Sequence, residues 1–296
     1  MGFEEIRLSR EAYKMRSQMR TVTDGVVTGL AILATGIVVV PLIAIFVYLI
    51  YKGASSLNLA FFTKVPAPVG ETGGGMANAI LGSAMVLALA SAIGVPIGIG
   101  GGIFLAEFGR GTKLAAAIRF TADVLNGVPS IVMGLAAYSL IVVPMKHFSG
   151  YAGGVALGFM MIPTVCRTSE EMLLMVPHAI REAALGLGVP NWRSVLSITV
   201  KTASPGIITG CMLAFARVAG ETAPLVFTAL GNQFWSTDLN QPIAALPLQI
   251  YVYALSPYDD WHRLAWAGSL VLIILIVFAV SLVRFVTSRG VLKGAS

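Results

Sequence analysis

Residues 181–188 read Arg-Glu-Ala-Ala-Leu-Gly-Leu-Gly and form a short polar island between two strongly apolar stretches. The pattern predicts a short helix with Glu182 near its start, where a carboxylate suits the positive end of the helix dipole. Ala183 and Ala184 are small helix formers that let a partner surface approach closely. Gly188 is suited to end the helix and to turn the chain. On spacing alone, an ordinary amphipathic loop helix that begins with glutamate is an equal alternative.

The composition is that of a membrane protein. Of the 296 residues, 56% are hydrophobic and 11% are charged, whereas a soluble domain has about 25% charged residues. The mean hydropathy is +0.83. Cys166 and Cys211 indicate neither a disulfide framework nor a metal site, and His147, His178 and His262 lack metal-ligand spacing. The first residues contain no short apolar core with a cleavage site, so no secretory signal is predicted.

Apolar runs of about 18 or more residues are typical of transmembrane helices. The sequence predicts six spans, of which the fourth is the shortest: Val26–Tyr51, Ala77–Leu105, Val124–Pro144, Tyr151–Val165, Pro205–Leu230 and Leu264–Phe285. The second span carries Gly94, Gly98 and Gly102 at intervals of four, a spacing that favours close helix packing. A phosphate-binding glycine loop is excluded there, because it needs a flanking strand and a Lys-Ser/Thr pair.

The distribution of positive charge orients these spans. With the N-terminus inside, fifteen of the twenty lysines and arginines lie in cytoplasmic segments, four lie in outer segments and Arg217 lies inside a span. Both termini are therefore predicted to be cytoplasmic, and so is Glu182. The net charge of +6 then faces anionic lipid and the cytoplasm, with no need for nucleic acid. Residues 1–25 mix charges with apolar side chains at roughly helical spacing, which predicts an amphipathic cytoplasmic segment on the membrane face.

The fifth predicted span contains two ionisable residues, Arg217 and Glu221, four positions apart. On a helix they would share a face and could pair, near the middle of a hydrocarbon core about 30 Å thick. Each charge costs on the order of 3 kcal/mol to insert. The pair is therefore either a structural ion pair that fixes the helix register, or part of an aqueous pathway in which Arg217 offers a transient site to an anion. The guanidinium suits phosphate because its planar fork donates two hydrogen bonds.

Three further residues, Asn126, Pro129 and Ser130, stand at the start of the third predicted span. Pro129 would begin or kink that helix, and Asn126 would either cap it or line the pathway. In the outer loop, residues 242–247 are predicted to form a short re-entrant or surface helix. The aromatic residues of this region are predicted to form an interfacial belt: Phe234, Trp235, Tyr251, Tyr253, Trp261 and Trp266.

The polar island resembles the cytoplasmic coupling motif of permease subunits in binding-protein-dependent ABC importers. The shared spacing is Glu-Ala-Ala-x3-Gly-x9-Ile, which ends here at Ile198. The family pattern continues with Leu-Pro, whereas Ile198 is followed by Thr-Val-Lys, so the bend before the next segment is not defined by the motif. The resemblance implies a coupling loop near residues 166–201. Its ATPase-facing residues would be Arg181, Glu182, Ala183, Ala184 and Gly188.

Three other stretches resemble the PstA-type family of phosphate importer permeases: Arg217–Leu225, the outer loop at 228–235 and 240–247, and Asn126–Ile131. They cover the second half of the chain well and the first half in patches. The resemblance implies an all-α, polytopic membrane domain of the type I ABC importer (MetI-like) fold with six helices over residues 26–296. It implies a substrate pathway that includes Arg217, Glu221 and Thr222, and structural or pathway roles for Asn126, Pro129 and Ser130.

The same resemblance implies a permease subunit of an ATP-driven phosphate importer, in the cytoplasmic (inner) membrane of a bacterium or archaeon. The implied partners are a PstC-type permease, two copies of a PstB-type ATPase that binds ATP and magnesium, and a PstS-type phosphate-binding protein. The chain contains no Gly-x4-Gly-Lys-Ser/Thr motif. It is therefore expected to hold no cofactor and to hydrolyse no ATP itself.

Three alternatives stay open on the sequence alone. A permease for sulfate, molybdate or an organic solute would share the coupling motif. A secondary anion transporter would show inverted repeats, which are not evident, and would leave the Glu-Ala-Ala island unexplained. An intramembrane enzyme would have only Ser130 and His147 as a nucleophile and a base, since the chain has no His-Glu-x-x-His motif.

Overall fold

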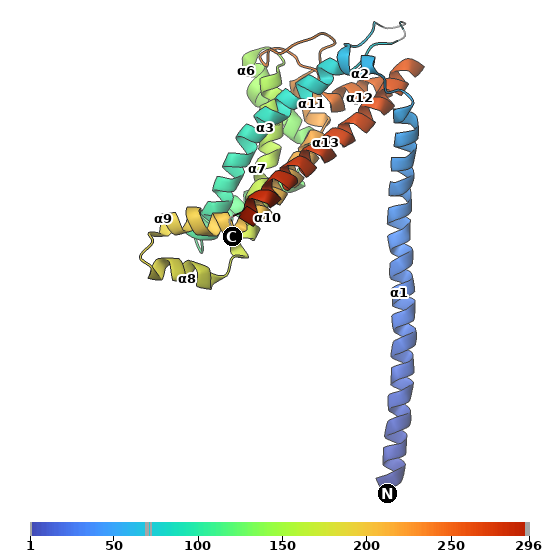
Figure 1. The fold of residues 1–296 in the computed structure, drawn as a ribbon, viewed down its shortest axis with the longest axis vertical. Helices are drawn as coiled ribbons and strands as arrows, with labels where there is room; N and C mark the ends of the chain where they lie inside the picture. The colour runs from blue at the N-terminus through green and yellow to red at the C-terminus, as the bar shows by residue number, and fades with distance from the viewer. Residues whose placement is uncertain (1, 69–70, 72, 294–296) are drawn as a thin grey trace. The chain divides into compact units, whose positions relative to one another are not determined.

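The computed structural model describes residues 2–68, 71 and 73–293, with side chains described for residues 19–21, 23–68, 71 and 73–287. The chain divides into two units, residues 1–51 and 52–296, and each is treated by itself. The described elements are helical, and their colours in Figure 1 follow the chain from blue to red. A single isolated bridge joins Leu230 to Ile243 in the described part.

The described part of the first unit belongs to one long helix, α1, whose bounds are Gly2–Ala54 and whose last three residues fall in the second unit. Its part from Met19 to Ala54 is long and apolar enough to cross a membrane, which confirms the first predicted span. Residues 2–25 are helical, as an amphipathic segment requires. Most of the side chains on which that prediction rests, such as Phe3 and Ile6, lie outside the described ones.

The second unit is built around two helices, α3 (Ala77–Ile103) and α7 (Gly150–Leu174), which lie side by side in Figure 1. The glycines of α3 make this contact possible. A Cβ atom built on Gly94 would lie 2.6 Å from the Cβ of Met161, and one on Gly98 would lie 2.6 Å from the Cβ of Val165. These distances are too short for a real side chain, so the predicted role of small residues in helix packing is confirmed.

Two further helices complete the apolar framework. α9 (Asn191–Ser194), the π-helical turn η3 (Val195–Thr199) and α10 (Val200–Ala219) form one continuous helix, and α13 spans Asp259–Lys293. The remaining elements are short: α2 (Leu59–Thr63), the π-helical turn η1 (Phe104–Phe108), α4 (Lys113–Gly127), α5 (Ser130–Ala137), the π-helical turn η2 (Tyr138–Val142), α6 (Val143–Met145), α8 (His178–Gly186), α11 (Ala223–Thr228) and α12 (Leu246–Ala254).

Four helices of the described part are long and apolar enough to cross a membrane, or five if one bent pair counts as a span. α7 is not among them, although it covers the fourth predicted span. It extends beyond Val165 to Leu174 and so includes Arg167 and Glu170. With α7 counted, each of the six predicted spans corresponds to a helix or to a broken helix.

The third and fifth predicted spans were wrong as continuous helices. In the third, α4 and the segment Ser130–Met145 meet at a bend of 107°. Pro129 directly precedes α5, so it begins a helix as expected, and the residue before a proline disfavours helical geometry. In the fifth, α10 ends at Ala219 and α11 begins at Ala223.

The outer loop also differs from its prediction. Residues 242–247 do not form a helix of their own, because α12 begins only at Leu246. The segment before it is extended and buried, with Ile243, Ala244 and Ala245 each at most 2% exposed. The Leu246 amide donates to the Ser83 hydroxyl of α3 at 2.6 Å, which fixes the loop against that helix.

Candidate functional site

The polar island forms α8, a helix of nine residues. Glu182 is its fifth residue and not near its start, so the predicted interaction with the helix dipole does not apply. Gly188 ends the helix as predicted: its φ is +77°, its amide donates to the Leu185 carbonyl at 2.9 Å, and the Val189 amide donates to the Ala184 carbonyl at 3.2 Å. This pair of bonds is the Schellman arrangement, in which glycine is favoured because its φ is positive.

The outward face of this region is apolar and accessible. Glu182 and Ala183 are exposed, and Ala184 is the buried residue of α8. Around them, large apolar side chains stand in solvent or lipid: Met175, Leu185, Leu187, Trp192 and Leu196, with Leu187 84% exposed. These side chains lie in α8 or in the segments directly before and after it.

Arg181, in contrast, is turned into the molecule and is only 12% exposed. Its guanidinium contacts the carboxylate of Glu107 in η1, with Nη2 2.6 Å from Oε1. It also donates to the carbonyls of Val176 and Leu173. The prediction placed Arg181 with the residues that face an ATPase, but its side chain points away from the exposed face of α8.

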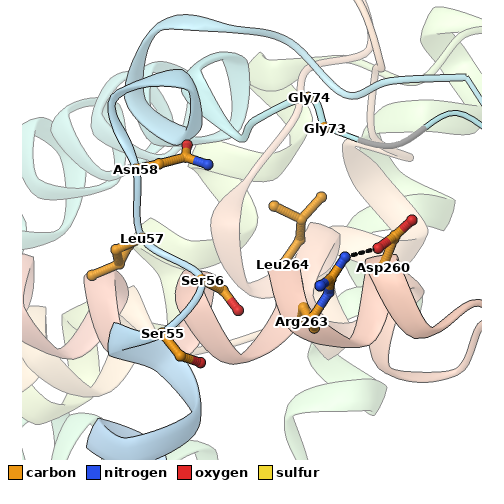
Figure 2. A pocket seen from close by; sticks show the side chains of 9 residues that line it. All are labelled: Ser55, Ser56, Leu57, Asn58, Gly73, Gly74, Asp260, Arg263 and Leu264. Atoms are coloured by element: carbon orange, nitrogen blue, oxygen red, sulfur yellow. Dashed lines mark hydrogen bonds and ion pairs between the residues drawn. The ribbon is translucent and has the colours of Figure 1, made fainter.

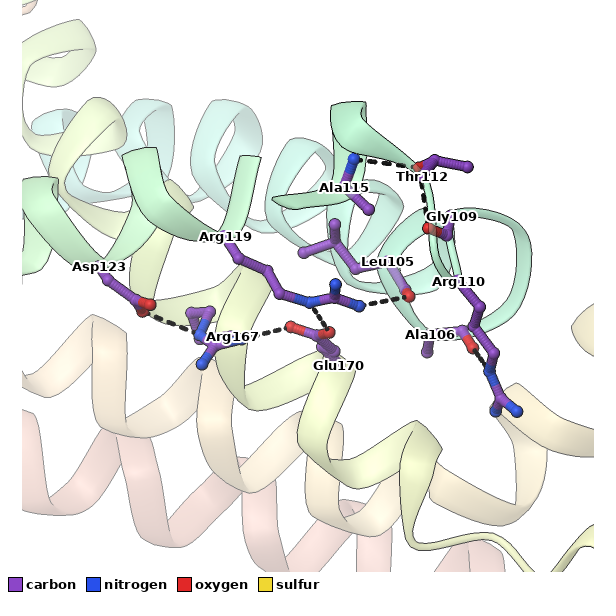
Figure 3. A network of polar contacts seen from close by, with 10 residues as sticks. All are labelled: Leu105, Ala106, Gly109, Arg110, Thr112, Ala115, Arg119, Asp123, Arg167 and Glu170. Carbon is purple, nitrogen blue, oxygen red and sulfur yellow. Dashed lines mark hydrogen bonds and ion pairs between the residues drawn. The ribbon is translucent and has the colours of Figure 1, made fainter. Parts of the chain in front are cut away.

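A second polar cluster ties α4 to α7 (Figure 3). The buried carboxylate of Glu170 accepts from Arg119 Nε and from Arg167 Nη1, both at 2.6 Å. Arg167 Nε also lies 3.0 Å from the carboxylate of Asp123. Arg119 Nη2 donates to the Leu105 carbonyl in η1 at 3.1 Å. Figure 3 shows these side chains in a row between the two helices.

Sequence reasoning missed this cluster. It treated Arg119 and Arg167 as charges that set the orientation, and it did not single out Glu170. The spacing of Arg167 and Glu170, three positions apart on one helix, was an available signal for a local pair. The contact between Glu170 and Arg119 joins residues 51 positions apart, and no local pattern encodes it.

The break after α10 carries the other predicted site residues. Arg217 is exposed and Glu221 is half-buried. Within the part of the chain that the structure describes, no ion pair or hydrogen bond of either side chain is present. The predicted Arg217–Glu221 pair is therefore wrong for this structure. Its physical cause is the end of the helix at Gly220, after which Glu221 no longer continues the face that carries Arg217.

Thr222 connects this break to the outer loop. Its hydroxyl donates to the Pro247 carbonyl at the start of α12, at 3.5 Å. α11, which follows the break, packs against α5: a Cβ on Gly134 would lie only 2.7 Å from the Cα of Pro224. Since α5 begins at the bend of the third span, the two broken spans lie against each other just beyond their breaks.

At the first break, Asn126 has a different role from the capping predicted as one possibility. Its Oδ1 accepts a hydrogen bond from the Thr164 hydroxyl on α7 at 2.9 Å. The N-cap of α5 is Pro129, which has no capping side chain. Ser130 is half-buried at the first position of α5. Asn126 therefore ties the end of α4 to α7 next to the bend.

A separate polar cavity of about 480 Å³ lies between the segment that follows α1 and the first turns of α13. Figure 2 shows the ion pair of Arg263 and Asp260 at its edge, facing Ser56 and Asn58. It shares no residue with either break. No group of three or more histidine, cysteine, aspartate or glutamate side chains could hold a metal ion within the described residues.

Comparison with known proteins gives one family and several close relatives. The family model for the binding-protein-dependent transport system inner membrane component matches residues 98–290. The phosphate transport system permease protein PstA of Yersinia pestis is 49% identical over 80% of this chain and 81% of its own length. The PstA 1 protein of Mycobacterium tuberculosis is 37% identical, covering 73% of this chain and 71% of its own length. A probable PstA of Methanocaldococcus jannaschii is 34% identical, covering 88% and 90%.

Solved structures agree on the fold. An inward-facing MetNI methionine ABC transporter chain is 20% identical and superposes with a TM-score of 0.56, covering 74% of this chain and 96% of its own. A chain of an amino acid ABC transporter gives a TM-score of 0.54 at 18% identity, covering 72% and 92%. At these identities the likeness establishes the architecture alone, which is the MetI-like one that the sequence predicted.

Proposed function

The chain belongs to the family of binding-protein-dependent transport system inner membrane components and is a permease subunit of a phosphate ABC importer, and we propose that its second helix break contributes to the phosphate pathway while α8 receives the ATPase. It is a multi-pass protein of the inner membrane and not an enzyme. Its relatives in bacteria and an archaeon are phosphate permeases by name. This favours phosphate over sulfate or molybdate as the transported anion.

The exposure of the Arg217 side chain, together with its lack of a partner among the described residues, is the observation that supports the proposed pathway. Arg217 lies in a predicted span, it is exposed, and it has no partner among the described residues. A charge at membrane depth is tolerated where it faces water, an anion or another protein chain. In the assembled transporter Arg217 would therefore meet the passing phosphate, on which its planar fork can donate two hydrogen bonds.

Glu221 and Thr222 complete this part of the pathway in the proposal. Glu221 stands on the far side of Gly220, where its negative charge would limit how tightly an anion is held. Thr222 positions the break through its bond to the Pro247 carbonyl. Asn126, Pro129 and Ser130 would set the geometry of the neighbouring break, since α5 packs on α11.

The exposed face of α8 would dock on an ATPase at the cytoplasmic side, with both termini of the chain also cytoplasmic. The exposed residues Glu182, Ala183 and Leu187 support this docking. The shape of the turn set by Gly188 would place them. The proposed assembly contains a PstC-type permease, two copies of a PstB-type ATPase that bind ATP and magnesium, and a PstS-type phosphate-binding protein. Closure of the ATPases would move α8 and switch the pathway between outward and inward access.

Phosphate uptake by the complete transporter tests the role of Arg217. Arg217→Gln removes charge-assisted hydrogen bonds of about 1.5–3 kcal/mol, which corresponds to a roughly ten- to hundredfold loss of uptake. Lys201→Gln is the matched control, because Lys201 is an exposed basic residue of the same helix, distant from the break. Normal uptake by an assembled Arg217→Gln transporter would refute the role of Arg217. Absence of phosphate uptake by the wild-type transporter would refute phosphate as its substrate.

A further inference from the structure

The π-helical turn η1 at the end of α3 receives three arginines from three different parts of the chain. Arg181 of α8 binds the Glu107 side chain. Arg119 of α4 donates to the Leu105 carbonyl at 3.1 Å, and Arg110 of the loop donates to the Ala106 carbonyl at 2.7 Å. Cations suit the carbonyls at a helix C-terminus, and π-helical turns are frequent at functional sites.

The attachment of α8 to the rest of the chain depends strongly on this turn. Ala184 is the buried residue of α8, so packing alone holds the helix weakly. Among the side chains of α8 that the structure describes, Arg181 makes the bonds to other elements of the fold: to Glu107 in η1, 74 positions away, and to the carbonyl of Leu173 at the end of α7. Glu107 and Arg181 are 8% and 12% exposed, so little water competes for the contact. A single buried ion pair thus joins α8 to η1.

The same turn is joined to the broken third span. Arg119 reaches η1 from α4 and also binds the buried Glu170 of α7. From Arg119 to the end of α4 at Gly127 the helix continues for about 12 Å at 1.5 Å per residue. The bend at Pro129 follows, and α5 beyond it packs on α11 at Gly134 and Pro224. Physical contacts therefore run without interruption from α8 to the two helix breaks.

We propose that Glu107 is a positioning residue for coupling: through Arg181 it makes α8 and η1 move together, and η1 passes the movement through Arg119 to the bend at Pro129. This inference rests on the proposed docking of α8 to the ATPase. Arg181 then acts inside the chain, and the exposed Glu182 and Ala183 contact the partner. Loss of the Glu107–Arg181 contact leaves ATP hydrolysis possible but disconnects it from the pathway.

The decisive quantity is the number of phosphate ions transported per ATP hydrolysed by the complete transporter in liposomes. Glu107→Gln is expected to lower this ratio about tenfold, within the range of allosteric coupling energies. Arg181→Gln should lower it at least as much, because it also removes the bonds to the Val176 and Leu173 carbonyls. The double variant should be no worse than Arg181→Gln alone, because both substitutions remove the Glu107–Arg181 contact. Glu171→Gln is the control, an exposed glutamate of α7 at the same end of the molecule.

An assembled Glu107→Gln transporter with a ratio within twofold of wild type would overturn the inference, as would single effects that multiply in the double variant. Should Glu107→Gln fail to assemble with the ATPase, Glu107→Asp decides, since it keeps the charge but is one methylene too short for the contact. A lowered ratio supports the inference, and an unchanged ratio overturns it.

A second readout does not depend on the substrate. Thr121 is an exposed residue of α4, and the variant Thr121→Cys places a thiol there. The rate at which this thiol is labelled, measured with and without ATP, reports the movement of α4. The native Cys166 and Cys211 are buried and serve as the background for this measurement. The ATP-dependent change in rate should disappear in Glu107→Gln and persist in Glu171→Gln. If wild type hydrolyses ATP without accumulating phosphate, the proposed function fails, while this labelling still decides the role of Glu107: a change that persists in Glu107→Gln overturns it.

Discussion

Replacing Glu170 by glutamine should destabilise the membrane domain, because this carboxylate is 2% exposed and accepts from two arginines at 2.6 Å. Glutamine keeps the shape but removes the charge, and its amide group turns a donor toward one guanidinium. A hydrogen bond to a charged group contributes about 1.5–3 kcal/mol. Arg119 and Arg167 are 33% and 29% exposed, so water recovers part of the loss.

Two further contacts reduce the cost of this substitution. Arg167 keeps Asp123 as a partner, and Arg119 keeps the Leu105 carbonyl. The expected net loss is about 3 kcal/mol, toward the lower end of what breaking a buried ion pair costs. For a unit of this size that loss lowers the thermal midpoint by roughly 6–12 °C.

The assay is the thermal midpoint of the assembled transporter in detergent, followed as the fraction that remains monodisperse in size-exclusion chromatography after heating. Glu171→Gln is the matched control, because it makes the same chemical change at the next, exposed position. Its effect should stay within about 0.5 kcal/mol. If the midpoint of Glu170→Gln falls no further than that of Glu171→Gln, the cluster does not hold α4 against α7 and the reasoning is refuted.

Two other substitutions test the helix contacts. Gly98→Leu should cost about 1–3 kcal/mol through overpacking against Val165, and this cost should lower the thermal midpoint of the transporter. Gly100→Leu is the control and should be tolerated, because nothing lies within 4 Å of a Cβ at that position. Equal midpoints for the two variants would contradict the close packing of α3 on α7. Gly188→Ala should cost about 1–2 kcal/mol, because the φ of Gly188 is +77°, and it should lower the amount of ATPase that copurifies with the permease. The matched variant Gly186→Ala should leave that amount unchanged. Equal amounts of copurified ATPase for the two variants would contradict a docking surface whose shape depends on this turn.

Local sequence patterns were sufficient where the cause is local. Hydropathy located each span to within a few residues at one end at least, because burial in lipid acts on every residue of a run. Gly94 and Gly98 revealed the face of α3 that packs on α7 through their spacing. Gly188 revealed the end of α8, since a positive φ at the end of a helix favours glycine whatever surrounds it.

The two helix breaks were missed although signals for them existed. Apolar residues predominate on both sides of the short segment around Gly220, so the length of the apolar run does not show that the hydrogen-bonded helix stops there. Gly220 followed by Pro224 is a helix-ending pair, and Val128 before Pro129 is biased away from helical geometry. These local signals were given less weight than the continuity of the apolar run. The error matters, because it placed Arg217 and Glu221 on one helical face.

The long-range contacts of Arg181 with Glu107 and of Glu170 with Arg119 were beyond any pattern in the sequence. Glu107 lies 74 positions from Arg181, and Arg119 lies 51 positions from Glu170. Such pairs exist only because α3, α4, α7 and α8 meet at one end of the molecule. A topology that brings these four helices together at one end predicts that their charged side chains lie close to one another. It does not predict which arginine pairs with which carboxylate.

Four arginines of the described part of the chain differ in what offsets their charge. Arg119, Arg167 and Arg181 all bind carboxylates inside the chain and so help to define its fold. Arg217, in a predicted span, has no such partner among the described residues. An unpaired guanidinium costs on the order of 3 kcal/mol at membrane depth, which the isolated chain does not offset. In the proposed transporter, water, a neighbouring permease or the transported anion would provide this compensation. Compensation by the anion would last only while the anion is bound at Arg217, as a transient binding site requires.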